Sequence, residues 1–167
     1  MLMRILKAGA VKVSVPVLDK LYPYKYHAIN LSFSRFCNAS CRMCVKTHYD
    51  ERSSALYLEE KILECALAQL KSMHVRDVNV FAMGEPLAHP RFNECIDKIV
   101  NAGLRVIFSS NAGLLKEKHF SALAKAHSLG FSIEGYDGET VRHYRGVSFD
   151  VLYKGITGLR QTVGSKR

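Results

Sequence analysis

Short strand-like stretches and amphipathic helical stretches follow one another along this chain. Strands are predicted over residues 27–34, 77–83, 104–110 and 129–135, the first of them from its alternation of apolar and polar side chains. Apolar residues at helical spacing predict helices over residues 56–73, 91–103, 116–127 and 150–163, with a shorter helix over residues 139–145. This order predicts an α/β fold of about four βα units, in which crossover helices join parallel strands.

Three of the predicted helices carry an apolar face that we expect to pack on the sheet. In the first helix this face comprises Leu58, Ile62, Leu63, Ala66, Leu67 and Leu70. In the second it comprises Phe92, Cys95, Ile96, Ile99 and Val100, and in the last it comprises Val151, Leu152, Ile156, Leu159 and Val163. Cys65 and Cys95 are interpreted as small hydrophobic core residues, because buried free cysteines behave in that way.

Residues with functional groups follow each predicted strand. A group of cysteines follows the first strand and Gly84–Glu85–Pro86 the second, while Ser109–Asn111 and Glu134–Gly135 end the third and fourth. The carboxyl ends of parallel strands lie at one edge of a sheet or barrel. All four groups are therefore expected to face one site.

Length and composition are those of one globular domain with a basic N-terminal segment. The chain has 167 residues, 48% of them hydrophobic, and a net charge of +9. Residues 1–46 hold eight Lys and Arg against one acid, Asp19, which gives +7 and leaves +2 for the remainder. We interpret residues 1–26 as a basic extension and residues 27–167 as the core domain. Because a basic segment attracts nucleic acid and phosphate, a nucleic-acid-binding module is an alternative function.

The sequence predicts a cytoplasmic protein without a membrane-spanning segment. It contains no run of 18 apolar residues, and Arg4, Lys7 and Lys12 interrupt the apolar N-terminus, so neither a membrane span nor a signal peptide is expected. The five cysteines are an odd number, which makes a poor disulfide framework and favours a reducing compartment.

Cys37, Cys41 and Cys44 form a C-x3-C-x2-C array that predicts a metal site. A closed structural zinc site needs four ligands, and ferredoxin-type clusters use four thiolates. Three thiolates must therefore borrow a fourth ligand or leave one coordination position open. His48 could complete a C-x3-C-x2-C-x3-H zinc site, which is a second alternative.

The cysteine array, the GEP sequence after the second strand, the Asn-bearing turn after the third and "SIEGYDGETVRHYRG" after the fourth resemble the radical SAM superfamily. The resemblance covers roughly residues 27–163 and is nearest to the branch with molybdenum-cofactor, pyrroloquinoline-quinone and peptide-maturation enzymes. It implies an enzyme in which three thiolates hold a [4Fe–4S] cluster. S-adenosylmethionine at the open iron is cleaved reductively, and the resulting 5′-deoxyadenosyl radical abstracts hydrogen from a substrate.

The resemblance also assigns site residues. Cys37, Cys41 and Cys44 would be the metal ligands, and Met43 would lie near the adenine of the cofactor. Gly84, through its backbone, and Glu85 would receive the ammonium group of S-adenosylmethionine. The remaining cofactor-binding candidates are Ser109, Asn111, Ser132 and Arg145. Arg145 would bind the carboxylate of the cofactor; the alternative is that it forms a surface ion pair and does not contact the cofactor.

Members of this superfamily usually have six βα units, whereas four are predicted here, so the expected fold is a partial (β/α) barrel. Its open interior is expected to expose apolar surface, and its fourth strand to form an edge that self-associates or pairs with a second polypeptide. An electron donor such as flavodoxin or ferredoxin is a further expected partner. The substrate stays open between peptide, small molecule and nucleic acid. The chain itself could be a natural short form of the enzyme, one half of a split enzyme or an inactive truncated relative.

Overall fold

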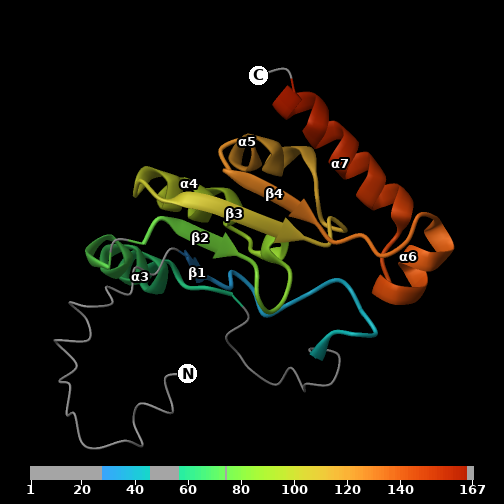
Figure 1. Ribbon diagram of the computed structural model, residues 1–167, viewed down its shortest axis with the longest axis horizontal. Helices are drawn as coiled ribbons and strands as arrows, with labels where there is room; N and C mark the ends of the chain where they lie inside the picture. The colour runs from blue at the N-terminus through green and yellow to red at the C-terminus, as the bar shows by residue number, and fades with distance from the viewer. Residues whose placement is uncertain (1–27, 46–56, 74, 165–167) are drawn as a thin grey trace, which may run out of the picture.

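Four parallel strands form one sheet in the order β1-β2-β3-β4 (Figure 1). The computed structural model describes residues 28–45, 57–73 and 75–164, so the basic extension and His48 lie outside the described residues. The strands are β1 Ala28–Asn30, β2 Asp77–Val80, β3 Arg105–Ser110 and β4 Ser128–Phe131. Each strand pairs in parallel with its neighbour in sequence, which confirms the predicted partial (β/α) barrel with an unclosed sheet.

Helices connect the strands as the sequence predicted. They are α3 Glu60–Ser72, α4 Phe92–Asn101, α5 Phe120–Leu123, α6 Gly138–Arg145 and α7 Phe149–Gly164, with 3-10 helices η2 Pro86–Ala88 and η3 Glu117–His119. The helix predicted over residues 116–127 is wrong in length, because it consists only of η3 and the four-residue α5. No helix within the described residues is long and apolar enough to cross a bilayer.

The hydrophobic core lies between one face of the sheet and the layer of helices against it (Figure 1). Val78, Val80, Val106 and Phe108 alternate along β2 and β3 and are at most 1% exposed. The helices meet them with Leu63, Ile96, Ile99, Leu123 and Leu152. This core orients β1 to β4 so that their carboxyl ends point toward the loops that carry the candidate site.

Two predicted core positions and one cysteine face solvent instead. Ile62 is 55% exposed and Val151 is 49% exposed, because each lies just beyond the stripe of its helix that meets the sheet. Cys65 is exposed on α3, where the side chain of Gln69 donates to its sulfur at 3.5 Å, so its assignment to the core was wrong. Cys95 on α4 is buried, as predicted, and burial raises the pKa of its thiol to about 11.

Within the strands the other face of the sheet is mainly polar. Phe81, Met83 and Ile133, which follow β2 and β4, are 36%, 42% and 43% exposed, so the expectation of exposed apolar surface stays a prediction. By the strand register this face carries Ala28, Asn30, Asp77, Asn79, Arg105, Ile107, Ser109, Ser128 and Gly130. The Asn79 amide donates to Asn30 at 2.8 Å, and the Arg105 guanidinium binds Asp77 at 2.6 and 2.8 Å. A face with these side chains has little hydrophobic driving force to bind a partner.

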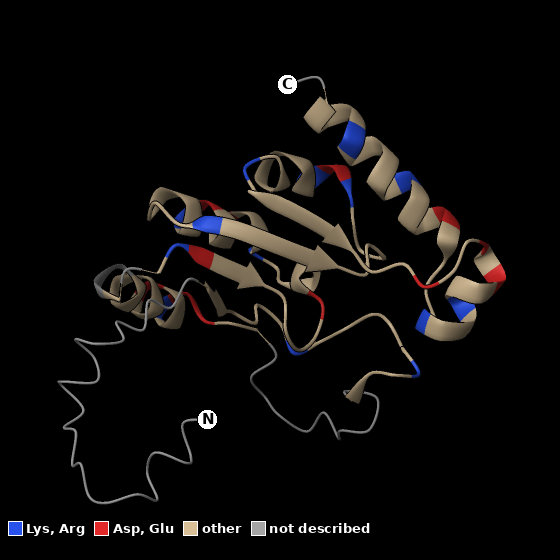
Figure 2. Ribbon diagram, in the orientation of Figure 1, with Lys and Arg blue, Asp and Glu red and all other residues tan. Residues whose placement is uncertain are grey.

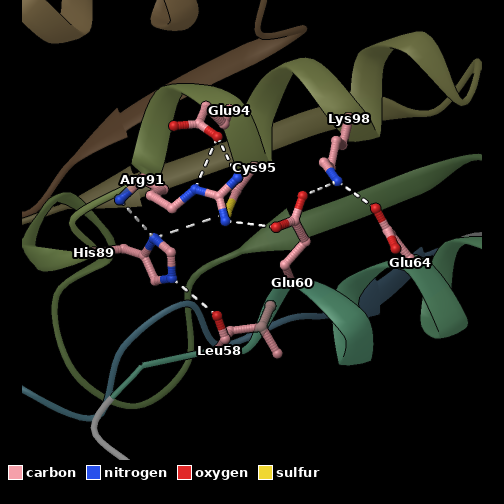
Figure 3. A network of polar contacts seen from close by, with 8 residues as sticks. All are labelled: Leu58, Glu60, Glu64, His89, Arg91, Glu94, Cys95 and Lys98. Carbon is pink, nitrogen blue, oxygen red and sulfur yellow. Dashed lines mark hydrogen bonds and ion pairs between the residues drawn. The ribbon is translucent and has the colours of Figure 1, made fainter.

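An ion-pair network joins the outer surfaces of α3 and α4 (Figure 3). Arg91 bridges Glu60 and Glu94, and Lys98 bridges Glu60 and Glu64. The hydrogen bonds from Arg91 and Lys98 lower the pKa of Glu60 to about 2. The network is exposed, so it stabilises the protein only modestly. It holds the side chain of Arg91, the residue just before α4.

His89 connects this network to the segment after β2 (Figure 3). The backbone N–H of Arg91 donates to His89 Nδ1 at 3.1 Å, so His89 Nε2 carries the hydrogen and donates to the Leu58 carbonyl at 3.0 Å. Cys95 Sγ lies 3.7 Å from the same Nδ1. His89 is 6% exposed and therefore anchors the end of η2 from within the core.

Substituting Cys95 with alanine should lower the free energy of unfolding by about 1 kcal/mol, because the change leaves a small cavity beside His89. Urea denaturation of the two proteins measures this difference. The matched variant Cys65→Ala changes an exposed cysteine and should stay within about 0.5 kcal/mol of the parent. Equal losses for the two variants would contradict the core assignment of Cys95.

Candidate functional site

Three segments hold the cysteine loop, residues 35–44, at the carboxyl edge of the sheet. They are the turn after β2, the turn after β3 and the C-terminal end of α6. The four groups of residues that follow the strands therefore converge on one site, as the sequence predicted.

Gly84 lets the turn after β2 lie directly against the cysteine loop. Its φ of +76° is a left-handed conformation, and a Cβ at this position would lie 2.1 Å from the carbonyl oxygen of Ser34 and 2.8 Å from that of Phe36. The next backbone N–H, that of Glu85, donates to the Phe36 carbonyl at 2.7 Å. Only glycine allows this close approach of the two backbones.

The carboxylate of Glu85 points into the protein and is 1% exposed. It accepts hydrogen bonds from the Ser110 hydroxyl at 2.7 Å, the Asn111 backbone N–H at 3.0 Å and the Leu87 backbone N–H at 3.1 Å. Burial raises the pKa of Glu85, and these three donors oppose that shift. Glu85 thus ties the turn after β2 to the end of β3, a role that the sequence did not reveal.

Asn111 ties the turn after β3 to the cysteine loop. Its side-chain N–H groups donate to Asn38 Oδ1 at 3.1 Å and lie 3.6 Å from Cys37 Sγ. Its side-chain oxygen accepts from the Gly113 backbone N–H at 2.8 Å, which orients the amide. Asn111 is 6% exposed and is therefore held in one orientation toward the cysteines.

The C-terminal end of α6 supports the middle of the cysteine loop. The backbone N–H groups of Ser40 and Arg42 donate to the carbonyls of Arg145 and Tyr144 at 3.0 and 3.1 Å. The Arg145 guanidinium pairs with Glu134, and its Nη1 lies 3.6 Å from Cys41 Sγ. Arg145 therefore forms an ion pair with Glu134 in this structure. Its expected contact with the carboxylate of a cofactor stays a prediction.

Basic residues gather around this edge of the molecule. Figure 2 shows Lys and Arg positions on α6 and on the cysteine loop close to one another, and the Arg42–Tyr144 contact joins the two segments. Arg35, Arg42 and Arg142 are exposed. Acidic side chains lie among them, because Glu134 pairs with Arg145, and Asp137 and Glu139 lie at the start of α6.

The three cysteines suit a cluster with separate thiolate positions. Cys41 is buried, whereas Cys37 and Cys44 are partly exposed, and Cys37 and Cys41 each lie near a side-chain N–H donor. Such donors complement the thiolates of an iron–sulfur cluster. Among the described residues no three His, Cys, Asp or Glu side chains are grouped to hold one metal ion. In a [4Fe–4S] cluster each thiolate binds a different iron.

The other predicted site residues lie at the same edge. Met43 is 59% exposed on the loop, Ser109 is half-buried on the polar face of the sheet, and Ser132 extends β4 by donating its N–H to the Ser110 carbonyl at 2.9 Å. Ser110 lies within the predicted Ser109–Asn111 group, but neither it nor Asn38 was assigned a role from the sequence. Ser110 could have been found from strand alternation, because it shares a face with the apolar Val106 and Phe108 and is thus a buried polar residue.

The described residues form an α/β domain, an unclosed parallel βα sheet with three cysteines near its carboxyl edge. The family model described as "Radical SAM superfamily" matches residues 31–164 of this chain. The chain belongs to the radical SAM superfamily, which confirms the family resemblance. Members of this superfamily use a [4Fe–4S] cluster and S-adenosylmethionine, in agreement with the cofactors expected.

Two curated proteins resemble the chain in sequence. The tungsten-containing aldehyde ferredoxin oxidoreductase cofactor-modifying protein of Pyrococcus furiosus is 32% identical over 99 residues, which are 57% of this chain and 26% of that protein. The S-adenosylmethionine-dependent nucleotide dehydratase of Selenomonas ruminantium is 24% identical over 118 residues, which are 69% of this chain and 42% of that protein. The chain thus spans less than half the length of either relative.

Solved structures share the fold at low sequence identity. Streptococcus suis SuiB bound to the precursor peptide SuiA has a TM-score of 0.68 and 20% identity, covering 81% of this chain and 30% of that chain. The structure of anSMEcpe with bound AdoMet has a TM-score of 0.61 and 19% identity, covering 82% of this chain and 41% of that chain. These likenesses confirm the partial barrel.

Replacing Gly84 with alanine should destabilise the protein more than replacing Gly103. Both glycines have a left-handed φ, which costs an alanine about 1–2 kcal/mol, but a Cβ at Gly103 would have no atom within 4 Å. Only Gly84→Ala forces the turn after β2 away from the cysteine loop. Thermal and urea unfolding of the two variants measure the difference, and equal losses would show that the clash at Gly84 is relieved at no cost.

Glu85 should make the protein less stable as pH rises. Because its pKa is raised on folding, the folded state binds the proton more tightly than the unfolded state. The stabilisation of the folded state by protonated Glu85 is complete below the ordinary glutamate pKa of about 4.3. This stabilisation is lost as pH rises through the raised pKa. Glu85→Gln cannot ionise, so wild type should lose stability relative to this variant between these pKa values.

Urea unfolding at a series of pH values measures this trend. The control Glu139→Gln changes an exposed carboxylate on α6 and should follow the wild-type pH profile. A wild type that gains stability relative to Glu85→Gln with rising pH would contradict the sign.

Proposed function

We propose that Cys37, Cys41 and Cys44 each bind one iron of a [4Fe–4S] cluster and that S-adenosylmethionine binds at the fourth iron. The chain would thereby act as a radical SAM enzyme on a substrate not yet identified. The observation that carries the proposal is the convergence of three cysteines, the Gly84 turn and Asn111 at the carboxyl edge of a radical SAM fold.

When bound at Cys37, Cys41 and Cys44, these groups would supply one-electron reductive cleavage of S-adenosylmethionine and, through it, radical abstraction of hydrogen from the substrate. The residues of this chain position the groups. Asn111 places an N–H donor beside Cys37, and Arg145 places one beside Cys41. Glu85 joins the turn after β2 to the end of β3 through its hydrogen bond with Ser110. Since three donors surround the Glu85 carboxylate, we assign the ammonium of S-adenosylmethionine to the backbone of Gly84, with Glu85 shaping the turn.

The remaining cofactor contacts are proposed from position. Met43 is exposed at the loop and suits the adenine, while Ser109 and Ser132 lie on neighbouring strands and suit the polar part of the cofactor. Reductive cleavage needs an external one-electron donor, such as flavodoxin or ferredoxin.

The substrate class stays open between peptide, small molecule and nucleic acid. A precursor peptide is named for SuiB and a nucleotide for the Selenomonas ruminantium relative, so both classes occur among similar proteins. Because the chain spans less than half of these relatives, the activity of a whole enzyme is part of the proposal. In the described residues β4 has a free edge, where the predicted self-association or second polypeptide would bind.

Anaerobic reconstitution with iron and sulfide should give about four irons and four sulfides per chain. Single substitution of Cys37, Cys41 or Cys44 with alanine should abolish a stable cluster, because each provides one of the three protein ligands. Cys95→Ala should load normally. Dithionite with S-adenosylmethionine should then yield 5′-deoxyadenosine, which chromatography with mass spectrometry detects.

Different failures of this experiment have different meanings. A fully loaded cluster that never yields 5′-deoxyadenosine would defeat the enzymatic proposal but leave the cluster site intact. One zinc per chain, without sulfide or brown absorbance, would defeat the cluster itself and favour the zinc alternative. An iron loss for Cys95→Ala equal to that of the loop variants would show that a ligand had been taken for a core residue.

A further inference from the structure

One cation lies against one of the three cluster thiols. Arg145 Nη1 is 3.6 Å from Cys41 Sγ, while Nε and Nη2 of the same guanidinium are both hydrogen-bonded to the carboxylate of Glu134. The side chain of Arg145 is 16% exposed, and Cys41 is 8% exposed. Because this contact is largely shielded from water, the positive charge acts on the sulfur with little screening.

The backbone fixes the same contact. The Arg145 carbonyl accepts the Ser40 N–H at 3.0 Å and lies 4.0 Å from Cys41 Sγ. Helix α6, which carries Arg145, is capped at its start by Asp137, whose carboxylate accepts from the Thr140 N–H at 2.7 Å. Arg145 is thus held at both backbone and side chain, and Glu134 sets the direction of the guanidinium.

The surroundings of the three thiols differ. Cys41 faces a cation, and Cys37 faces the neutral amide of Asn111 at 3.6 Å. Within the described ranges no side-chain donor contacts Cys44 Sγ, whose residue is held only through its backbone N–H to the Cys41 carbonyl at 3.1 Å. Cys41 is therefore the thiol against which a cationic side chain is observed.

We propose that Arg145, oriented by Glu134, raises the reduction potential of the cluster through its charge and its N–H group at Cys41. This inference rests on the proposed function, because it requires the cluster. An added electron makes an iron–sulfur cluster more negative, and cations and N–H donors at its sulfur ligands stabilise that form. Glu134 is a positioning residue whose own negative charge partly offsets the effect of Arg145.

The two members of this ion pair therefore have opposite effects on the potential. Removing the Arg145 charge should lower the potential, since the reduced cluster loses a cation that contacts one of its ligands. Replacing Glu134 with glutamine should raise it, because the amide oxygen still accepts from Arg145 while the opposing charge is gone. A purely structural ion pair would give no such difference in sign.

The experiment compares reconstituted wild type, Arg145→Ala, Glu134→Gln and the control Arg142→Ala. Arg142 is an exposed arginine on the same helix, so its loss removes an equal charge without removing the observed contact of Arg145 with Cys41. Mediated redox titration, followed by EPR without S-adenosylmethionine, gives each midpoint potential, and iron counts give each loading. We expect a lower potential for Arg145→Ala, a higher one for Glu134→Gln and a smaller change for Arg142→Ala.

The outcomes separate this inference from the proposed function. A wild type that takes up no cluster defeats the proposed function. Loaded variants with unchanged potentials, or with shifts of the same sign for Arg145→Ala and Glu134→Gln, overturn the inference while the cluster site stands. If Arg145→Ala fails to load, Glu134→Gln decides, because it keeps the cation and the backbone contacts: a rise in potential supports the inference, and no rise overturns it.

Discussion

The site is organised by one buried carboxylate. Glu85 accepts three hydrogen bonds inside the protein, from the end of β3, from the turn after β3 and from the start of η2. A buried carboxylate that lost these donors would incur a large desolvation cost. The turn after β2 and the turn after β3 therefore keep a fixed position relative to each other. Through its backbone N–H to Phe36, the same residue fixes the start of the cysteine loop. The cysteine loop is thus positioned from the core outward.

The loop has further supports of different chemistry, and these make its cysteines inequivalent. Asn111 offers a neutral amide to Cys37, whereas Arg145 offers a cation to Cys41. Both donors are themselves oriented, Asn111 by the Gly113 N–H and Arg145 by Glu134. Supporting residues of this kind set the properties of a metal centre as much as the ligands do. The proposed cluster would therefore meet a different donor at Cys37 than at Cys41.

The sheet gives this site a rigid base and an adjoining polar surface. One face of β2 and β3 is buried by α3, α4 and α5. On the opposite face Asn30 pairs with Asn79, and Asp77 pairs with Arg105. An unclosed sheet of this composition can face water without an apolar partner. The four βα units thus form a coherent domain, although the chain spans only part of the length of its relatives.

The sequence by itself determined the order of strands and helices, the parallel sheet and the place of the cysteines. These follow from local periodicity and from the rule that residues after parallel strands meet at one edge. It also determined the core role of Cys95, which lies in the middle of an apolar stripe. Tertiary structure decided that Cys65 and Ile62 face solvent, because the width of the buried stripe depends on how closely a helix meets the sheet.

Tertiary structure also decided the roles of the polar residues. The inward direction of Glu85, its partner Ser110 and the contact of Arg145 with Cys41 join residues that are 25 and 104 positions apart in the chain. Periodicity states which face of an element a residue occupies, but not which distant group its functional atoms reach. A hydrogen bond needs donor and acceptor placed within a few tenths of an ångström, and only the packed arrangement of loops sets that distance.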